Sequence, residues 1–237
     1  MSIRIGRIKY VGGKKIYPEY DGYELVEVMT RSTKYGALSP YELKDPNGFI
    51  IENVWQFSKV YDTVPKSVQR YSQYDNTIVW DWPAETHVDP VTRELTPAYF
   101  KWRTEGFKCP YAVRYPVGMT ARHKCLYSYH NGQTLDYIES RKQIYIPLYL
   151  QSVVSQPLFK KLLASKANLL IAEVDGPHSE SMPYYTATYG VPSDFIVNDT
   201  VLCTPQNLKI LLNDPKHPFG HGYCLGMALT FSILLVL

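Results

Sequence analysis

The stretch ENVWQFSKVY, residues 52–61, places an acid, an amide and an amine at helical spacing just after the Gly-Phe-Ile-Ile run at 48–51. On a helical wheel Glu52, Gln56 and Lys59 share one stripe, and apolar side chains share the opposite one. Glu52 and Lys59 lie two turns apart, about 10 Å in rise, so they could address two ends of one ligand. A solvated surface helix gives the same pattern, and periodicity alone leaves both interpretations open.

Upstream of this predicted helix the sequence favours short strands. Residues 3–11 alternate well enough for a strand, and the Gly12-Gly13 pair predicts the turn of an N-terminal hairpin. The turn at 39–48 then leads into the apolar run that precedes Glu52.

Downstream the sequence predicts mainly helices. The run 62–97 is rich in Pro, Asp and Thr and is expected to be loop, after which a helix capped by Thr96 ends at Gly106. The further elements expected are helices over 134–145, 148–165 and 204–214 and an apolar strand over 168–174. The apolar end, 225–237, is shorter than the roughly 20 residues of a membrane span, so we expect a buried helix or strand there.

These elements predict a mainly α (α+β) fold, a single compact helical domain with a few short β-strands and an N-terminal hairpin. With 237 residues, the chain is long enough for one substantial core. The sequence lacks the regular strand-helix alternation of a doubly wound sheet, and it contains no G-x-G-x-x-G or P-loop motif.

Composition narrows the classes of partner. The net charge of +3 permits a polyanion but does not resemble the dense basic stripe of a sequence-specific DNA-binding protein. Tyrosine is in excess, with 21 residues against 8 Phe and 4 Trp. Its ring and hydroxyl suit the binding of bases and riboses, although Tyr is also common at half-buried positions.

Cysteine and histidine spacing argues against a metal site. The cysteines form no C-x-x-C pair, so neither a zinc knuckle nor a disulfide framework is indicated. His178 and His221 lack a nearby set of carboxylates, and we predict no metal. The N-terminus lacks the apolar core of a secretory signal, so we expect an intracellular protein of the cytoplasm or nucleus.

Three blocks, in this order, resemble signatures of the NADAR family of YbiA-like N-glycosidases. Residues 35–61 are similar to the leading signature, a Leu-Ser turn before a helix carrying Glu, then Gln four residues on, then Lys three further. The matching residues are Leu38, Ser39, Glu52, Gln56 and Lys59. Residues 145–178 resemble the family's helix, turn and strand ending in Glu, here Glu173, and residues 217–229 resemble its Trp-Gly-x-Gly turn and closing helix.

The chain departs from the family pattern at several places. Phe219 stands where the family usually has Trp, and a long loop separates Glu173 from Gly220. The resemblance therefore implies a single domain over 1–237, with an N-terminal strand extension at 1–34 and an insertion-rich region at 62–130. Such insertions could enlarge the surface for substrate and partner.

The resemblance implies a hydrolase that cuts the N-glycosidic bond between ADP-ribose and guanine in ADP-ribosylated DNA or RNA. Two alternatives remain: an N-glycosidase acting on phosphorylated ribosylamino-pyrimidine metabolites, and a non-catalytic module that binds ADP-ribose or a nucleotide. We expect ADP-ribosylated nucleic acid or ADP-ribose as partner, no cofactor, no membrane and no obligate protein partner, and a monomer.

The catalytic residues that the resemblance implies are Glu52, Lys59 and Glu173. In the preferred mechanism Glu52 shuttles the proton while Lys59 attacks the anomeric carbon of the ring-opened ribose as a Schiff-base amine. The amine would need a depressed pKa, from desolvation or cationic neighbours. Acid/base hydrolysis by Glu52 and Glu173 is the alternative.

Each substrate-binding candidate has a plain structural alternative. Trp55 and Tyr127 could stack on a base or could pack in the core, and Arg141 with Lys142 could pair a diphosphate or lie on a solvated helix face. The turn at 220–222 brings main-chain N–H groups near phosphate or ribose, although its histidine is more often structural. The predicted set is Ser39, Trp55, Gln56, Tyr127, Arg141, Asp175, Gly220, His221 and Gly222.

Overall fold

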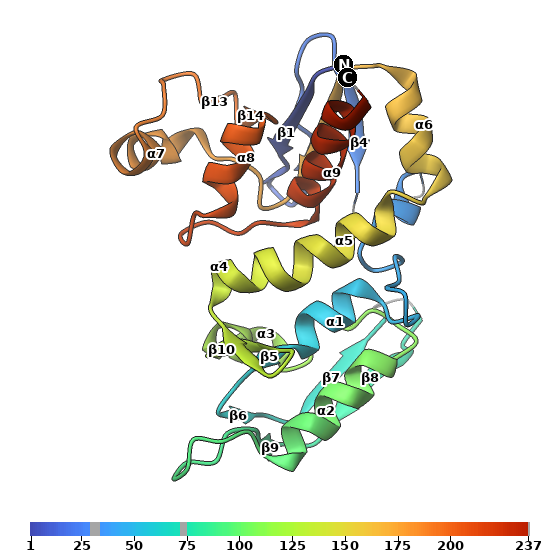
Figure 1. Cartoon of the computed structure of the whole chain (residues 1–237), viewed down its shortest axis with the longest axis vertical. Coiled ribbons are helices and arrows are strands. Elements are labelled where there is room, and N and C mark those ends of the chain that lie inside the picture. Colours follow the sequence, from blue (N-terminus) through green and yellow to red (C-terminus); the bar gives the residue numbers. More distant parts are fainter. Residues whose placement is uncertain (29–33, 72–74, 237) are drawn as a thin grey trace. The chain divides into compact units, whose positions relative to one another are not determined.

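The structure, a computed structural model, describes residues 1–28, 34–71 and 75–236 (Figure 1). The chain forms two compact units, Met1–Ser39 with Tyr149–Leu237, and Pro40–Leu148. Helix accounts for 39% and strand for 23% of the residues that the structure describes. The fold is therefore α+β, and the prediction of a mainly α domain is wrong because many short strands carry no clear periodic signal.

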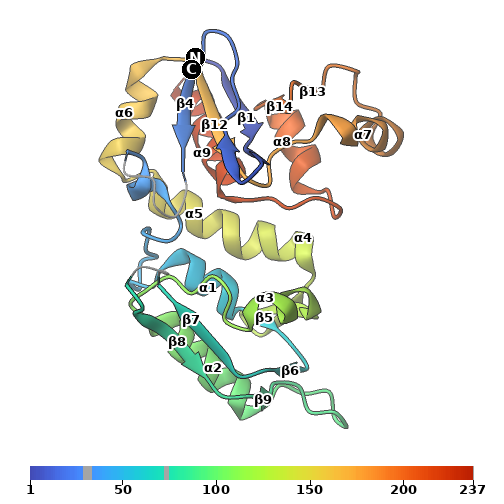
Figure 2. The same ribbon diagram turned by 180° about the vertical axis from the view of Figure 1, so that it is seen from behind.

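The first unit is built on a five-stranded mixed sheet in the order β13-β14-β1-β12-β4. β12 is parallel to both neighbours, whereas β1 is antiparallel to β14 (Figure 2). All five residues of β12 are buried, which confirms the strand predicted over 168–174. The strands are β1 (Ile3–Arg7), β4 (Glu24–Glu27), β12 (Leu169–Glu173), β13 (Ile196–Val197) and β14 (Thr200–Leu202).

Residues 1–34, expected as an extension, thus supply β1 and β4 of this sheet. The predicted hairpin is confirmed, because β2 (Lys9–Val11) and β3 (Lys14–Ile16) pair antiparallel around Gly12 and Gly13. Both glycines have positive φ, 55° and 77°, a conformation that costs Gly little.

Helices complete the first unit. α9 packs on β1 and β12, and α8 packs on α9 (Figure 1). The Thr204 side chain accepts a hydrogen bond from the N–H of Asn207 at the start of α8, which confirms the capped helix predicted there. The helical segments are η1 (Gly36–Leu38), α6 (Pro157–Ser165), η4 (Ser179–Ser181), α7 (Met182–Tyr189), α8 (Pro205–Leu212) and α9 (His221–Val236). Within the described part of the chain, no helix is long and apolar enough to cross a bilayer.

The described part of the second unit contains one three-stranded sheet and two two-stranded sheets. The three-stranded sheet has the order β11 (Gln133–Leu135), β10 (Tyr127–His130) and β5 (Lys59–Val60). The two-stranded sheets pair β6 (Thr63–Val64) with β9 (Glu85–Thr86) and β7 (Ser67–Arg70) with β8 (Ile78–Trp82), each antiparallel. The expectation that 62–97 is loop is therefore wrong, because long-range pairing orders strands that are too short to show alternation.

The helices of the second unit begin where local signals place them. α2 (Pro97–Lys108) starts after Thr96, whose hydroxyl accepts the N–H of Tyr99, and it ends two residues beyond the predicted Gly106. The remaining helical segments are α1 (Ile51–Phe57), α3 (Gly118–Ala121), η2 (Arg122–Lys124), α4 (Tyr137–Ser140) and the π-helical turn η3 (Arg141–Tyr145). α5 (Ile146–Val153) begins in this unit, and its residues from Tyr149 on belong to the first unit. The helices expected over 134–145 and 148–165 are thus each divided or shortened.

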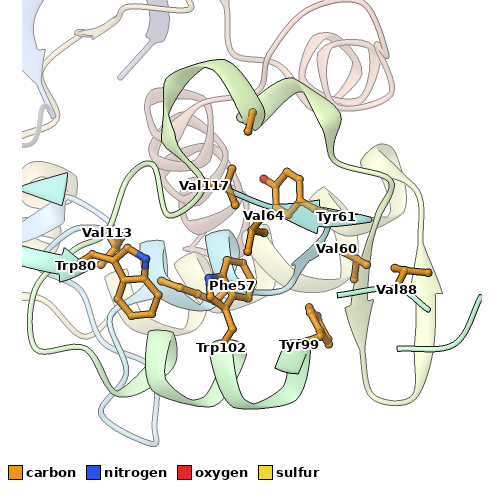
Figure 3. Close-up of a cluster of buried hydrophobic side chains, with 11 residues drawn as sticks. Phe57, Val60, Tyr61, Val64, Trp80, Val88, Tyr99, Trp102, Val113 and Val117 are labelled. Atoms are coloured by element: carbon orange, nitrogen blue, oxygen red, sulfur yellow. The ribbon is translucent and has the colours of Figure 1, made fainter. Parts of the chain in front are cut away.

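An aromatic core holds the second unit together (Figure 3). The ring of Phe57, the last residue of α1, contacts the rings of Trp80 and Trp102 with centroids 4.6 Å apart in both pairs. Gly106 of α2 faces the same ring so closely that a Cβ there would lie 2.0 Å from Cδ1 of Phe57. This core fixes the end of α1, immediately before Lys59.

Candidate functional site

Glu52, Gln56 and Lys59 form a hydrogen-bonded chain in the second unit. Gln56 Nε2 donates to Glu52 Oε1 at 2.7 Å, and Lys59 Nζ donates to Gln56 Oε1 at 2.9 Å. Glu52 is only 4% exposed. The amide of Gln56 therefore has one orientation that serves both partners, and the surface-helix interpretation of residues 52–61 is wrong for Glu52.

Lys59 does not lie on the helix, contrary to the prediction. α1 ends at Phe57, and the hydroxyl of Ser58 donates to the Val54 carbonyl at 2.7 Å. Lys59 then opens β5, opposite Ser128 of β10. Strand pairing, rather than helical periodicity, aims its side chain at Gln56.

The surroundings of Lys59 favour a reactive amine. Burial lowers the pKa of Lys59, while the negative charge of nearby Glu52 raises it in part. The ammonium group lies 4.9 Å from the ring centroid of Trp55, a cation–π distance. The net effect lowers the pKa, so a larger fraction of Lys59 is neutral near pH 7 than of an exposed lysine.

Aromatic rings line the same region. Trp55 is 9% exposed, and its ring lies 4.9 Å from that of Tyr145 at an angle of 30°. Tyr145 closes the π-helical turn η3, and such turns are frequent at functional sites. Sequence reasoning missed Tyr145, and only the tyrosine excess pointed toward it.

Sequence reasoning also missed Cys125, which lies near Lys59. Burial raises the pKa of its thiol, and the positive charge of Lys59 lowers it in part. No motif surrounds Cys125 in the sequence, so only the fold could reveal this proximity.

Tyr127 and Arg141 take part in the internal structure of the second unit. Tyr127 pairs with Val60 across the sheet and packs against the aromatic core. This agrees with the alternative that Tyr127 packs in the core. Arg141 is fully buried, with its guanidinium carbon 4.0 Å from the Tyr137 ring centroid. Lys142 instead pairs with Glu139 at 3.0 Å, so the two basic residues have different environments.

Glu173 is bound by the backbone at the start of α9, within the first unit. Its Oε2 accepts the N–H of Gly222 at 2.6 Å, and its Oε1 accepts the N–H of Asp175 at 3.3 Å. A Cβ at Gly220 would lie 2.6 Å from Oε2, and one at Gly222 would lie 2.9 Å from it. The Gly-x-Gly sequence thus admits a buried carboxylate, which interacts favourably with a helix N-terminus.

The other predicted residues of the first unit lie in turns or at the ends of helices. Ser39 is fully buried and donates its N–H to Gly36 at 2.8 Å. Asp175 is exposed, and its carbonyl accepts the hydroxyl of Tyr223 at 3.3 Å. His221 is the first residue of α9.

The predicted site residues thus fall into two groups, one in each unit. The second unit holds Glu52, Trp55, Gln56, Lys59, Tyr127 and Arg141, and the first holds Ser39, Glu173, Asp175, Gly220, His221 and Gly222. Among residues 1–28, 34–71 and 75–236, no three His, Cys, Asp or Glu side chains are arranged to hold a metal ion. No family model, curated protein or solved structure matches this chain.

Proposed function

We propose that this protein is an N-glycosidase that hydrolyses the bond between ADP-ribose and guanine in ADP-ribosylated DNA or RNA. The observation that supports this most is the chain Glu52–Gln56–Lys59, in which a buried carboxylate and an amine of lowered pKa share one amide. A proton carrier and a nucleophile are the two groups that a Schiff-base route for this reaction requires.

Lys59 acts as the nucleophile. The neutral amine attacks C1 of the ring-opened ribose, and the guanine amine leaves with a proton. Water then attacks the resulting Schiff base and returns the free amine, so ADP-ribose and the nucleic acid with its guanine unmodified are the only products. Glu52 carries protons for these steps, and Gln56 holds the carboxylate and the amine in place through its two hydrogen bonds.

The ring of Trp55 lies beside the amine and packs against that of Tyr145, and both rings are buried. Aromatic rings suit the binding of a purine, because aromatic stacking tolerates any base. The acid/base alternative with Glu173 remains a prediction, and the hydrogen bonds from Gly222 and Asp175 favour a structural role for that carboxylate.

Turnover of an ADP-ribosylated oligonucleotide tests the proposal. Wild type should release ADP-ribose, and Glu52→Gln should lower the rate by about 100-fold or more, which is typical for loss of a general acid/base. Glu105→Gln, an exposed change on α2, is the matched control and should behave as wild type. Equal rates for wild type and Glu52→Gln would contradict the proposal.

The same assay separates the alternatives. Hydrolysis of a free phosphorylated ribosylamino-pyrimidine in preference to the oligonucleotide would assign the metabolite reaction. Binding of ADP-ribose without turnover of either substrate would assign a non-catalytic module.

A further inference from the structure

A second cluster of reactive side chains lies in the first unit and is not used by the proposed glycosidase. Ser181 Oγ lies 3.0 Å from His217 Nε2, and His217 Nδ1 lies 2.6 Å from Asp214 Oδ2. Ser181 ends η4 just before α7, and the other two residues follow α8. The order of contacts is hydroxyl, imidazole, carboxylate, which is the arrangement that activates a serine nucleophile.

The carboxylate of Asp214 is held in a charged state. It is fully buried and accepts the hydroxyls of Tyr184 at 2.8 Å and Tyr185 at 2.6 Å, and the N–H of Lys216 at 2.9 Å. Burial alone opposes the charged form, but the hydrogen bonds from these groups and from His217 hold the pKa of Asp214 below its usual value. A charged Asp214 keeps the proton of the imidazole on Nδ1.

The imidazole is oriented on both sides. Tyr185 stacks on the His217 ring with centroids 5.3 Å apart at 21°, and Tyr184 contacts its edge at 5.4 Å. With the proton on Nδ1, Nε2 presents its lone pair to the hydroxyl of Ser181. The side chain of His217 is 24% exposed and Ser181 is half-buried, so neither residue is closed off from solvent.

We propose that Ser181, His217 and Asp214 form a second catalytic site, a serine esterase site for carboxylic esters. Ser181 Oγ attacks the carbonyl carbon while His217 Nε2 takes the hydroxyl proton. The tetrahedral intermediate expels the alcohol, which receives that proton, and leaves an acyl-serine. Water, deprotonated by His217, then releases the carboxylic acid and restores Ser181.

The backbone geometry favours esters over amides. The N–H of Ser181 donates to the His178 carbonyl at 2.9 Å, and Pro183 in the first turn of α7 has no N–H. Neither residue can therefore donate a main-chain N–H to an oxyanion. Oxyanion stabilisation is a large contribution to catalysis. The site therefore suits substrates with a good leaving group, and alkoxides leave more readily than amines.

A fluorophosphonate probe tests this site directly, since its product on serine is stable and carries a defined mass. Folded wild type should be modified on Ser181, as read by peptide mass spectrometry, and should release p-nitrophenolate from p-nitrophenyl acetate. Ser181→Ala should abolish both reactions. His217→Gln should slow the labelling by about 100-fold or more.

Two controls separate the triad from general serine reactivity. Ser193→Ala removes an exposed serine and should label as wild type. Wild type unfolded in urea contains the same serines without the triad and should stay unlabelled. Failure of folded wild type to label on Ser181, or equal labelling of folded and unfolded protein, would overturn the proposal.

Discussion

Replacing Gly106 with Ala should destabilise the second unit by about 2 kcal/mol net, because so short a contact belongs near the upper end of the overpacking cost, about 3 kcal/mol, and helix propensity returns about 1 kcal/mol. The new methyl carbon would lie 2.0 Å from Cδ1 and 2.2 Å from Cγ of Phe57, against the 3.5–4.0 Å of an ordinary carbon contact. The ring cannot retreat easily, since it also contacts Trp80 and Trp102. The gain in helix propensity from Gly to Ala, about 1 kcal/mol at most, offsets the clash only in part.

Urea and thermal unfolding measure this loss. At about 2–4 °C per kcal/mol for a chain of this length, the midpoint should fall by about 4–8 °C. Thr104→Ala on the exposed side of the same helix is the control and should change stability by less than about 0.5 kcal/mol. Adding Phe57→Leu to Gly106→Ala should cost less than the sum of the single changes. An unchanged or raised midpoint for Gly106→Ala would refute the packing described here.

Three further changes give distinct outcomes. Lys59→Arg keeps the positive charge but removes the nucleophilic amine, so the hydrolysis rate should fall as far as in Lys59→Ala. If Lys59→Arg kept most of the activity, the role of Lys59 would be electrostatic. Asn53→Asp should lower the free energy of unfolding by about 3 kcal/mol, because its amide nitrogen donates to two carbonyls, at 3.0 Å and 2.9 Å; denaturant unfolding checks this. Burial opposes ionisation of Asp199, but Lys9 and Ser179 hold its pKa at about 2. The stability that this charge adds should be present above about pH 4, near the usual Asp value, and be lost toward pH 2. The free energies of unfolding of wild type and Asp199→Asn should therefore converge as the pH falls toward 2. A difference between them that stays constant with pH would contradict this.

Local signals predicted some elements of the fold well. Thr96 and Thr204 cap their helices as expected, because a cap depends on a few adjacent residues. β12 was evident from its continuous apolar run. The strand pairs within 62–97 were missed, because strands of two to five residues depend on partners that a single stretch does not reveal.

The candidate site was predictable in its residue types but not in its geometry. Glu52, Gln56 and Lys59 do contact one another, yet Lys59 reaches Gln56 from a strand rather than from a helix. Ser181 and His217 lie 36 positions apart, and no sequence motif links them. Contacts of this kind follow from the fold and not from spacing along the chain.

Borohydride reduction during turnover of ADP-ribosylated oligonucleotide tests the proposed mechanism most directly. The mechanism predicts a covalent sugar adduct on Lys59 of wild type, absent from Lys59→Ala and present in Lys101→Ala, an exposed lysine change on α2. Turnover by wild type with no adduct on Lys59 would contradict nucleophilic catalysis by this amine.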